Sequence, residues 1–223
     1  MKIFNQIAAV YDRMNHVMSL GRDKRWRELA CKAVDMEPLR ILDLATGTGD
    51  LALALRKRFP QAEIIGLDSS AGMLESAREK AKTANIKFIE GDAHKIAQSV
   101  EVSVDLITCA FGFRNFSDQR LALRECAQIL KPDGRLVVLE FFRPGSRFLG
   151  RMVNLWISFI AFVFAHSNRD AYRYLTNSIS GAKTELEFRQ LASSVGFIAV
   201  SRHWYSPSCT RLEFCKDASG GRK

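Results

Sequence analysis

Between residues 39 and 141 the sequence alternates short apolar runs with longer helical patterns, and no other feature limits the possible folds as strongly. Apolar runs of strand length cover residues 40–45, 63–67, 86–90, 104–110 and 135–141. Helical patterns lie between them, at residues 51–59, 72–83 and 118–130. This rhythm is typical of parallel strands that are buried on both faces by the helices connecting them. We therefore predict an α/β fold with a mostly parallel sheet.

The chain is expected to form one domain, because 223 residues with 47% hydrophobic content suit a single core. Around a cofactor-binding core at residues 39–141 we expect a helical lid at 1–36, an apolar insertion at 144–183, and a helix with two strands at 184–216. The two late strands, at residues 197–205 and 211–216, would complete the sheet.

Capping and turn residues predict where several helices begin and end. Asp23 is a candidate N-cap for a helix over residues 24–34, and Asp118 is one for the helix that follows it. Thr184 and Glu187 have the spacing of a capping box. The run Pro132-Asp133-Gly134 predicts a turn that ends the preceding helix.

Charge and cysteine content narrow the surroundings of the protein. Lys and Arg total 33 against 24 acidic residues, a formal charge of +9, which suits either an ordinary basic protein or a polyanionic neighbour such as nucleic acid or anionic lipid. The five cysteines form no CxxC pair and have no metal-ligand spacing with histidine. No secretory signal pattern is present. We expect a cytoplasmic protein without a metal site.

A glycine-rich turn follows the first expected strand, in the run Asp43-Leu44-Ala45-Thr46-Gly47-Thr48-Gly49-Asp50. Glycines between a strand and a helix let a ligand approach the backbone closely. The run from Gly47 to Ala52 also satisfies a loose dinucleotide fingerprint, so an NAD-dependent reductase is an alternative.

Acidic residues after the first three strands favour a different cofactor. Asp68 ends the second strand, where a carboxylate can accept from ribose hydroxyls, and Asp92 with Ala93 follows the third. Asp43 suits the cationic amino end of a methionine and would repel a pyrophosphate. Residues 39–141 resemble the class I S-adenosylmethionine-dependent methyltransferases, which implies a Rossmann-like, mostly parallel seven-stranded sheet with helices on both faces. The resemblance assigns S-adenosyl-L-methionine to Asp43, Gly47, Thr48, Gly49, Asp68, Met73, Asp92 and Ala93.

Three further stretches narrow the family. They are residues 4–15 with 19–21 and Trp26-Arg27, residues 111–118 with 123–125, and residues 171–179. Together they resemble the UbiE-type C-methyltransferases of menaquinone and ubiquinone biosynthesis. The resemblance implies methyl transfer to a ring carbon of a polyprenylated quinol, either a demethylmenaquinol or a 2-polyprenyl-6-methoxy-1,4-benzoquinol. It requires no metal.

The resemblance places catalysis at Arg114 and Asn115 and substrate binding at Tyr11, Asp12 and Phe113. A guanidinium is a poor base, so we expect Arg114 to stabilise the quinol phenolate as a fixed cation while Asn115 orients the hydroxyl. His16 is a weaker candidate for a proton acceptor. We expect no chemical role for the other histidines, which are His94, His166 and His203.

The sequence departs from the family's pattern near the substrate side, at Phe142-Arg143, Gly181-Ala182 and residues 205–210. Benzoquinol and naphthoquinol substrates therefore both stay open. The sequence is also compatible with methylation of RNA or of a small aromatic, and with a non-catalytic subunit of a quinone-synthesis complex.

Residues 152–165 are strongly apolar but too short to span a bilayer. We predict that the apolar insertion, with its apolar run at residues 148–165, forms the mouth of the quinol site and binds anionic membranes reversibly, with a buried core helix as the alternative. A homodimer or a quinone-synthesis complex is the expected assembly, without nucleic acid.

Overall fold

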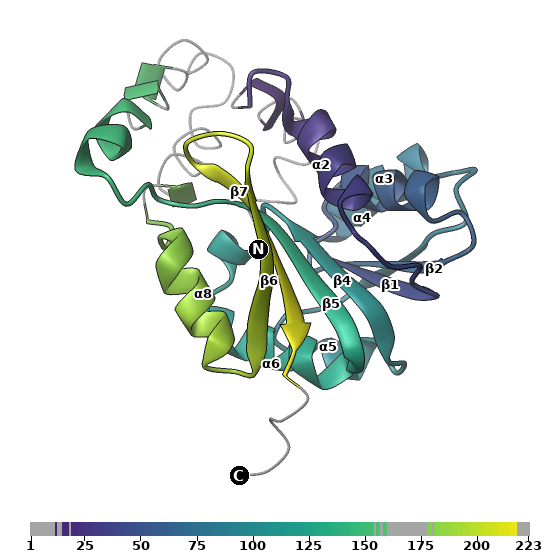
Figure 1. Ribbon diagram of the computed structural model, residues 1–223. Coiled ribbons are helices and arrows are strands. Elements are labelled where there is room, and N and C mark those ends of the chain that lie inside the picture. The colour runs from purple at the N-terminus through teal and green to yellow at the C-terminus, as the bar shows by residue number, and fades with distance from the viewer. Residues whose placement is uncertain are drawn as a thin grey trace.

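The computed structural model describes Asp12 and residues 15–17, 19–153, 155–156, 158–159, 178–179 and 181–217. Its centre is a seven-stranded sheet in the order β3-β2-β1-β4-β5-β7-β6 (Figure 1). The strands are β1 (Arg40–Leu44), β2 (Glu63–Asp68), β3 (Lys87–Glu90), β4 (Val104–Ala110), β5 (Leu130–Phe141), β6 (Phe197–Trp204) and β7 (Cys209–Lys216). The first five strands pair in parallel, whereas β7 pairs antiparallel with both β5 and β6. The predicted mostly parallel sheet of seven strands is confirmed.

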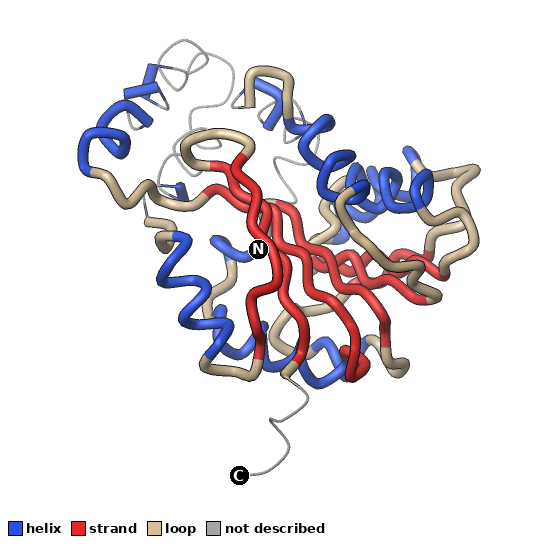
Figure 2. The backbone as a smooth tube through the Cα atoms, viewed as in Figure 1, coloured by secondary structure: helices blue, strands red, loops and turns tan. Residues whose placement is uncertain are grey.

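Helices cover both faces of this sheet (Figures 1 and 2). They are α2 (Asp23–Lys32), α3 (Asp50–Arg58), α4 (Ala71–Lys80), α5 (Ile96–Ser99), the 3-10 turn η1 (Phe113–Asn115), α6 (Gln119–Ile129) and α8 (Glu185–Ser193). Helix α2 packs against α3, and on the other side of the sheet α6 packs against α5 and α8.

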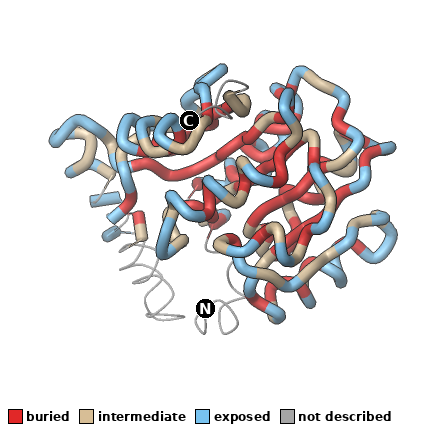
Figure 3. The backbone as a smooth tube through the Cα atoms, turned by 90° about the horizontal axis from the view of Figure 1, so that it is seen from below, coloured by how far each residue is buried: buried red, intermediate tan, exposed pale blue. Residues whose placement is uncertain are grey.

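The strands bury both of their faces because successive side chains alternate between two core clusters (Figure 3). On β1, Ile41 contacts the cluster under α2 and α3, whereas Leu42 packs into the cluster under α6 and α8. On β4, Leu106 likewise packs into the cluster under α2 and α3, and Ile107 packs into the cluster under α6 and α8. Two covered faces explain why the sequence shows continuous apolar runs and not an alternation with polar residues.

Two capping predictions are confirmed and two local predictions are wrong. Asp118 caps α6 by accepting from the backbone N–H of Leu121, and Thr184 and Glu187 form the capping box of α8. Asp23, however, is the first residue of α2 and caps nothing. Its carboxylate instead accepts hydrogen bonds from neighbouring side chains.

The predicted turn at residues 132–134 lies inside β5. Strand β4 pairs Val104 with Leu130 and then Leu106 with Arg135, so residues 131–134 bulge out of a strand that resumes its register. The turn motif therefore marks a bulge within β5, because Leu130, which precedes the motif, already pairs with β4.

Candidate active site

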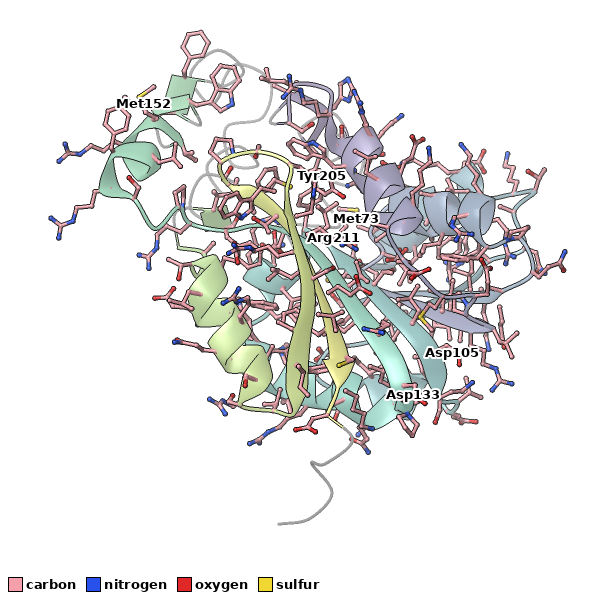
Figure 4. All side chains as sticks on the ribbon, viewed as in Figure 1. Met73, Asp105, Asp133, Met152, Tyr205 and Arg211 are labelled. Carbon is pink, nitrogen blue, oxygen red and sulfur yellow. The ribbon has the colours of Figure 1, made fainter. Side chains whose placement is uncertain are left out.

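A cavity of about 330 Å³ opens at the carboxyl ends of β1, β2, β3 and β4. It lies where the strand order reverses between β1 and β4, the place where open α/β sheets bind ligands. Met73 on α4 lines it, whereas Asp105 and Asp133 mark the opposite end of the strands (Figure 4). The volume suits a small-molecule site.

The glycine turn between β1 and α3 forms one wall of the cavity. Gly47 and Gly49 have φ angles of 57° and 83°, a left-handed conformation that side chains disfavour. A Cβ on Gly49 would also lie 3.1 Å from the Cβ of Ala77 on α4. Gly47 has open space where its Cβ would be, so a ligand can reach the backbone there.

Asp68, at the end of β2, holds this turn in place. Its Oδ2 accepts from the backbone N–H of Gly47 at 2.9 Å, and its Oδ1 accepts from that of Ser70 at 3.0 Å. Burial raises the pKa of the carboxyl, and the backbone hydrogen bonds only partly offset that effect. Because Asp68 also lines the cavity, it is available to hydroxyl groups of a ligand.

Asp43 is a fully buried carboxylate that faces the cavity from the end of β1. Thr46 donates to its Oδ2 at 2.6 Å and Thr108 donates to its Oδ1 at 2.8 Å. Burial nevertheless raises the pKa of Asp43 to about 6. A buried carboxylate next to a cavity attracts a cationic group of a ligand, because the pairing compensates the cost of burying its charge.

Asp92 and Ala93 line the cavity after β3, and so does His94, for which the sequence analysis expected no role. Nδ1 of His94 lies 2.6 Å from Oδ1 of Asp92, and Nε2 accepts from the backbone N–H of Asp118 at 3.2 Å. Both ring nitrogens of His94 therefore have polar partners. Hydrogen bonding from the backbone N–H of His94 is the main cause that lowers the pKa of Asp92. The sequence signal for His94 was its position two residues after Asp92, because an aspartate side chain commonly accepts a hydrogen bond from the residue two positions ahead.

Asp12, from the segment predicted to form a lid, lies beside the glycine turn. Thr48 Oγ1 donates to Asp12 Oδ1 at 2.5 Å, and Lys80 of α4 bonds Asp12, Thr48 and Asp50. Burial alone would lower the pKa of Lys80, but its hydrogen bonds to Asp12 and Asp50 raise it. Lys80 was not among the predicted site residues. Tyr11, predicted to bind the substrate, lies outside the described residues.

Arg114, predicted to stabilise the substrate phenolate as a cation, is not among the residues that line the cavity. Its Nη1 donates to Glu140 Oε1 at 2.6 Å and to the backbone oxygen of Phe111 at 2.7 Å. Both charged side chains are only 2% exposed. Glu140 at the end of β5 therefore neutralises Arg114 and fixes the direction of its side chain. The sequence pattern gave no sign of this partner.

Asn115 faces the cavity, but Phe113 does not. Asn115 Nδ2 donates to the same Phe111 oxygen at 3.2 Å, so Arg114 and Asn115 share one acceptor. The ring of Phe113 is buried against Phe116 and Phe188, which places it in the core and not at the predicted substrate position.

Two residues at the cavity edge have strained backbones. Ala45 after β1 and Phe111 after β4 have φ angles of 53° and 60°, which non-glycine residues rarely adopt. Such strain clusters at functional sites. Phe111 stacks on Phe141 with ring centroids 4.8 Å apart, and Arg27 of α2 lies over its ring, with 5.1 Å from the guanidinium carbon to the centroid.

A model of the ubiE/COQ5 methyltransferase family matches residues 1–210, nearly the whole chain. The chain belongs to this family. The demethylmenaquinone methyltransferase of Thermotoga maritima is 42% identical over 203 residues, which cover 88% of this chain and 87% of the relative. The ubiquinone/menaquinone biosynthesis C-methyltransferase UbiE of Geobacter sulfurreducens is 37% identical over 204 residues, which cover 87% and 79% of the two chains.

Solved structures share the fold of this ubiE/COQ5 family member. An S-adenosylmethionine-dependent methyltransferase of Thermotoga maritima aligns with a TM-score of 0.67 at 19% identity, covering 97% of this chain and 99% of that one. The plantazolicin methyltransferase BpumL, solved with S-adenosylhomocysteine, aligns with a TM-score of 0.66 at 15% identity, covering 95% and 89%. The protein is a Rossmann-like methyltransferase.

The side chains around the cavity of this methyltransferase fit S-adenosylmethionine better than a dinucleotide. Its acidic lining residues are Asp43, Asp50, Asp68 and Asp92. These carboxylates would repel a pyrophosphate, whereas they suit the ammonium and sulfonium groups of S-adenosylmethionine and can accept from hydroxyl groups. The NAD-dependent alternative therefore lacks support in the cavity. No cluster of three or more potential metal ligands occurs among the residues that the structure describes.

Cofactor binding is expected to release protons near pH 6 because Asp43 is half protonated there. A ligand ammonium, already charged at this pH, favours the carboxylate and would expel up to about half a proton. For the ligand-free protein, a raised carboxyl pKa means that the contribution of Asp43 to stability is full below about pH 3.8 and is lost as the pH rises through 6.

Calorimetry with S-adenosylhomocysteine at pH 6, in buffers of different ionisation enthalpy, measures the released proton. Asp92→Asn should keep the release, because the pKa of Asp92 is lowered and its carboxyl is already charged. Asp43→Asn should remove it. Release that persists in Asp43→Asn would assign the proton to Asp68 instead and contradict the prediction.

Proposed function

We propose that this protein is an S-adenosylmethionine-dependent C-methyltransferase whose substrate is a polyprenylated quinol precursor. The substrate is a demethylmenaquinol, a 2-polyprenyl-6-methoxy-1,4-benzoquinol, or both. The observation that carries the proposal is the acidic cavity at the strand ends in a chain of the ubiE/COQ5 family. Relatives 35–42% identical are named for demethylmenaquinone or for ubiquinone and menaquinone biosynthesis.

The cavity walls supply what methylation of a quinol ring requires. When bound, S-adenosylmethionine supplies an activated methyl group, so the protein has to align the ring carbon, exclude water and accept a hydroxyl proton. Phe111 and Phe116 form an apolar wall against which a ring can lie, and Asn115 stands beside them as a hydrogen-bonding group. Asn115 orients the ring hydroxyl.

Arg114 acts through its neighbours and not by direct contact with the quinol. Its guanidinium binds the Phe111 oxygen that Asn115 also binds, and Glu140 fixes the guanidinium from the opposite side. Arg114 is thus a positioning residue that holds Phe111 and Asn115 at the cavity edge. A substitution there would lower turnover more than it weakens cofactor binding.

The apolar insertion contacts an anionic membrane. Among the described residues, no helix is long and apolar enough to cross a bilayer. The helical residues between 147 and 159 instead present exposed apolar side chains at a spacing of four, three and four positions, which is one side of a helix. These are Phe148 (74% exposed), Met152 (51%), Leu155 (65%) and Phe159 (58%). Met152 lies at an outer corner of the molecule, away from the sheet (Figure 4).

Basic residues accompany this apolar stripe. Arg143, Arg147 and Arg151 are exposed, and the last two lie one helical turn apart. Arginines beside an apolar helix face suit the interface of a membrane with anionic headgroups. A polyprenyl tail has to be reached in or near the bilayer, and an apolar helix face with basic neighbours suits that task. The exposed side chains disfavour the alternative of a buried core helix.

Changing Phe148 and Leu155 together to serine should reduce co-sedimentation with vesicles of phosphatidylglycerol and phosphatidylcholine by at least about tenfold, since both lose apolar surface that would enter the interface. The melting temperature should stay nearly unchanged, because exposed side chains contribute little to stability. Leu186→Ser, which removes a 57% exposed leucine on α8, is the matched control and should bind vesicles normally. Unchanged vesicle binding of the double variant, or a loss shared by the control, would contradict membrane docking by this stripe.

Deleting the gene in its host and examining the quinones by mass spectrometry tests the proposed function. The expected result is a quinone precursor that accumulates with one methyl group missing from its ring, and its ring type identifies the substrate. Normal quinones together with a methyl group missing from RNA would replace the proposal with RNA methylation.

A further inference from the structure

The charges around the cavity are unequal in number. Among the described lining residues, four are aspartates, and Arg27 is the one lysine or arginine. His94 also lines the cavity, but its Nδ1 lies against Asp92 and its Nε2 against the backbone N–H of Asp118, so both ring nitrogens have partners within the protein. Lys80, which does not line the cavity, already pairs with Asp50, so Arg27 is the lining cation that an anionic ligand group can reach.

Arg27 is a buried cation with hydrogen-bonding capacity to spare. Its side chain is 8% exposed, and its Nη1 donates to Asp23 Oδ2 at 2.8 Å. A guanidinium has five N–H donors, and among the described residues Asp23 is the one acceptor of a hydrogen bond from it. The face of the group lies over the ring of Phe111. No nitrogen of Arg27 is a buried atom without a partner, so its other N–H groups reach solvent. Because Arg27 lines the cavity, these groups can donate to an acceptor of a ligand.

Asp23 is held by groups that fix the orientation of Arg27. Ser19 Oγ donates to Asp23 Oδ1 at 3.2 Å and accepts from the Asp23 backbone N–H, while His16 Nδ1 lies 3.1 Å from the same Oδ1. Burial raises the pKa of Asp23, but the charge of Arg27 and these hydrogen bonds prevail, so the pKa lies below its ordinary value. Asp23 stays charged and keeps Arg27 in one place.

We propose that Arg27 binds the carboxylate of the methionine part of S-adenosylmethionine and that Asp23 positions it. This inference rests on the proposed use of that cofactor, which carries two cationic groups and one anionic group, the carboxylate. The four aspartates suit the cations and hydroxyls, and Arg27 is the complement that remains for the anion. A charge-assisted pair between a guanidinium and a carboxylate is among the stronger polar contacts available in a partly enclosed site.

The test compares two ligands that differ only in the carboxylate, S-adenosylhomocysteine and its decarboxylated analogue, by calorimetry. Arg27→Gln should weaken binding of S-adenosylhomocysteine by about 10- to 100-fold, as expected for loss of a charge-assisted hydrogen bond. Binding of the decarboxylated analogue should change less than about threefold. Asp23→Asn should show the same selectivity with a smaller loss, because it frees Arg27 without removing it.

Equal weakening of both ligands would make Arg27 a structural residue and overturn the proposal. Unchanged affinity for S-adenosylhomocysteine, with a raised KM for the quinol, would overturn it in favour of a substrate oxyanion. If Arg27→Gln fails to fold, Arg27→Lys is measured in its place, because it keeps the charge but loses the planar pair of N–H donors. It should bind S-adenosylhomocysteine more weakly than wild type and bind the decarboxylated analogue as wild type does. Wild-type protein that fails to bind S-adenosylhomocysteine at all would instead refute the proposed cofactor, so the two failures are distinguishable.

Discussion

Replacing Glu140 with alanine is expected to lower the free energy of unfolding by about 3–5 kcal/mol, because it removes the carboxylate that pairs with the buried guanidinium of Arg114. Both side chains are 2% exposed, and Nη1 and Oε1 are 2.6 Å apart. Glu140 also accepts from the backbone N–H of Arg114 and of Phe141. One carboxylate thus supports both the turn after β4 and the end of β5.

Chemical denaturation of wild type and variant measures this loss. Glu63→Ala is the matched control, since its ion pair with Arg40 is exposed and should contribute less than about 1 kcal/mol. A double variant with methionine at positions 114 and 140 should be more stable than Glu140→Ala, because it replaces both buried charges with apolar side chains. A Glu140→Ala protein as stable as the Glu63→Ala control would show that the buried pair does not hold this edge of the cavity.

Replacing Asp68 with alanine should weaken binding of S-adenosylhomocysteine by about 10- to 150-fold, which corresponds to roughly 1.5–3 kcal/mol for lost charge-assisted hydrogen bonds. The carboxylate holds the backbone N–H groups of Gly47 and Ser70, so its loss also releases the glycine turn. In this variant the glycine turn and the ligand therefore lose the same hydrogen-bond acceptor.

Calorimetry against Asp105→Ala separates this effect from a general loss of stability. Asp105 lies at the opposite end of the strands and binds the backbone N–H groups of Leu39 and Arg40 (Figure 4). That variant should lose stability and keep its affinity for the ligand. Equal affinities in wild type and Asp68→Ala would remove Asp68 from the cofactor site.

The predicted cofactor residues come together at one cavity because the signals that predict them are local. The glycine turn and the acidic residues after β2 and β3 each stand directly after a strand, and the strand ends of a parallel sheet meet at one edge. Of the predicted cofactor residues, all except Gly49 line the cavity. Gly49 instead starts α3 in a left-handed conformation.

The missed features depend on pairs of residues that are far apart in the sequence. Glu140 neutralises Arg114 across 26 positions, and Lys80 reaches Thr48 across 32. No periodicity or spacing connects such partners. The location of Arg114 next to the cavity edge followed from the end of β4, but the direction of its side chain depended on a carboxylate from β5. The burial of Phe113 in the core depends in the same way on a distant element, since α8 supplies the ring of Phe188 against which it packs.

Transfer of a labelled methyl group by the purified protein is the most direct test of the central claim. The protein is mixed with S-adenosylmethionine carrying ¹³C in its methyl group and with reduced demethylmenaquinol or 2-polyprenyl-6-methoxy-1,4-benzoquinol, and the product is examined by NMR spectroscopy. The account predicts a labelled methyl group bonded to a ring carbon of at least one of the two quinols. A label found on a ring oxygen, or no transfer to either quinol by protein that binds S-adenosylhomocysteine, would contradict it.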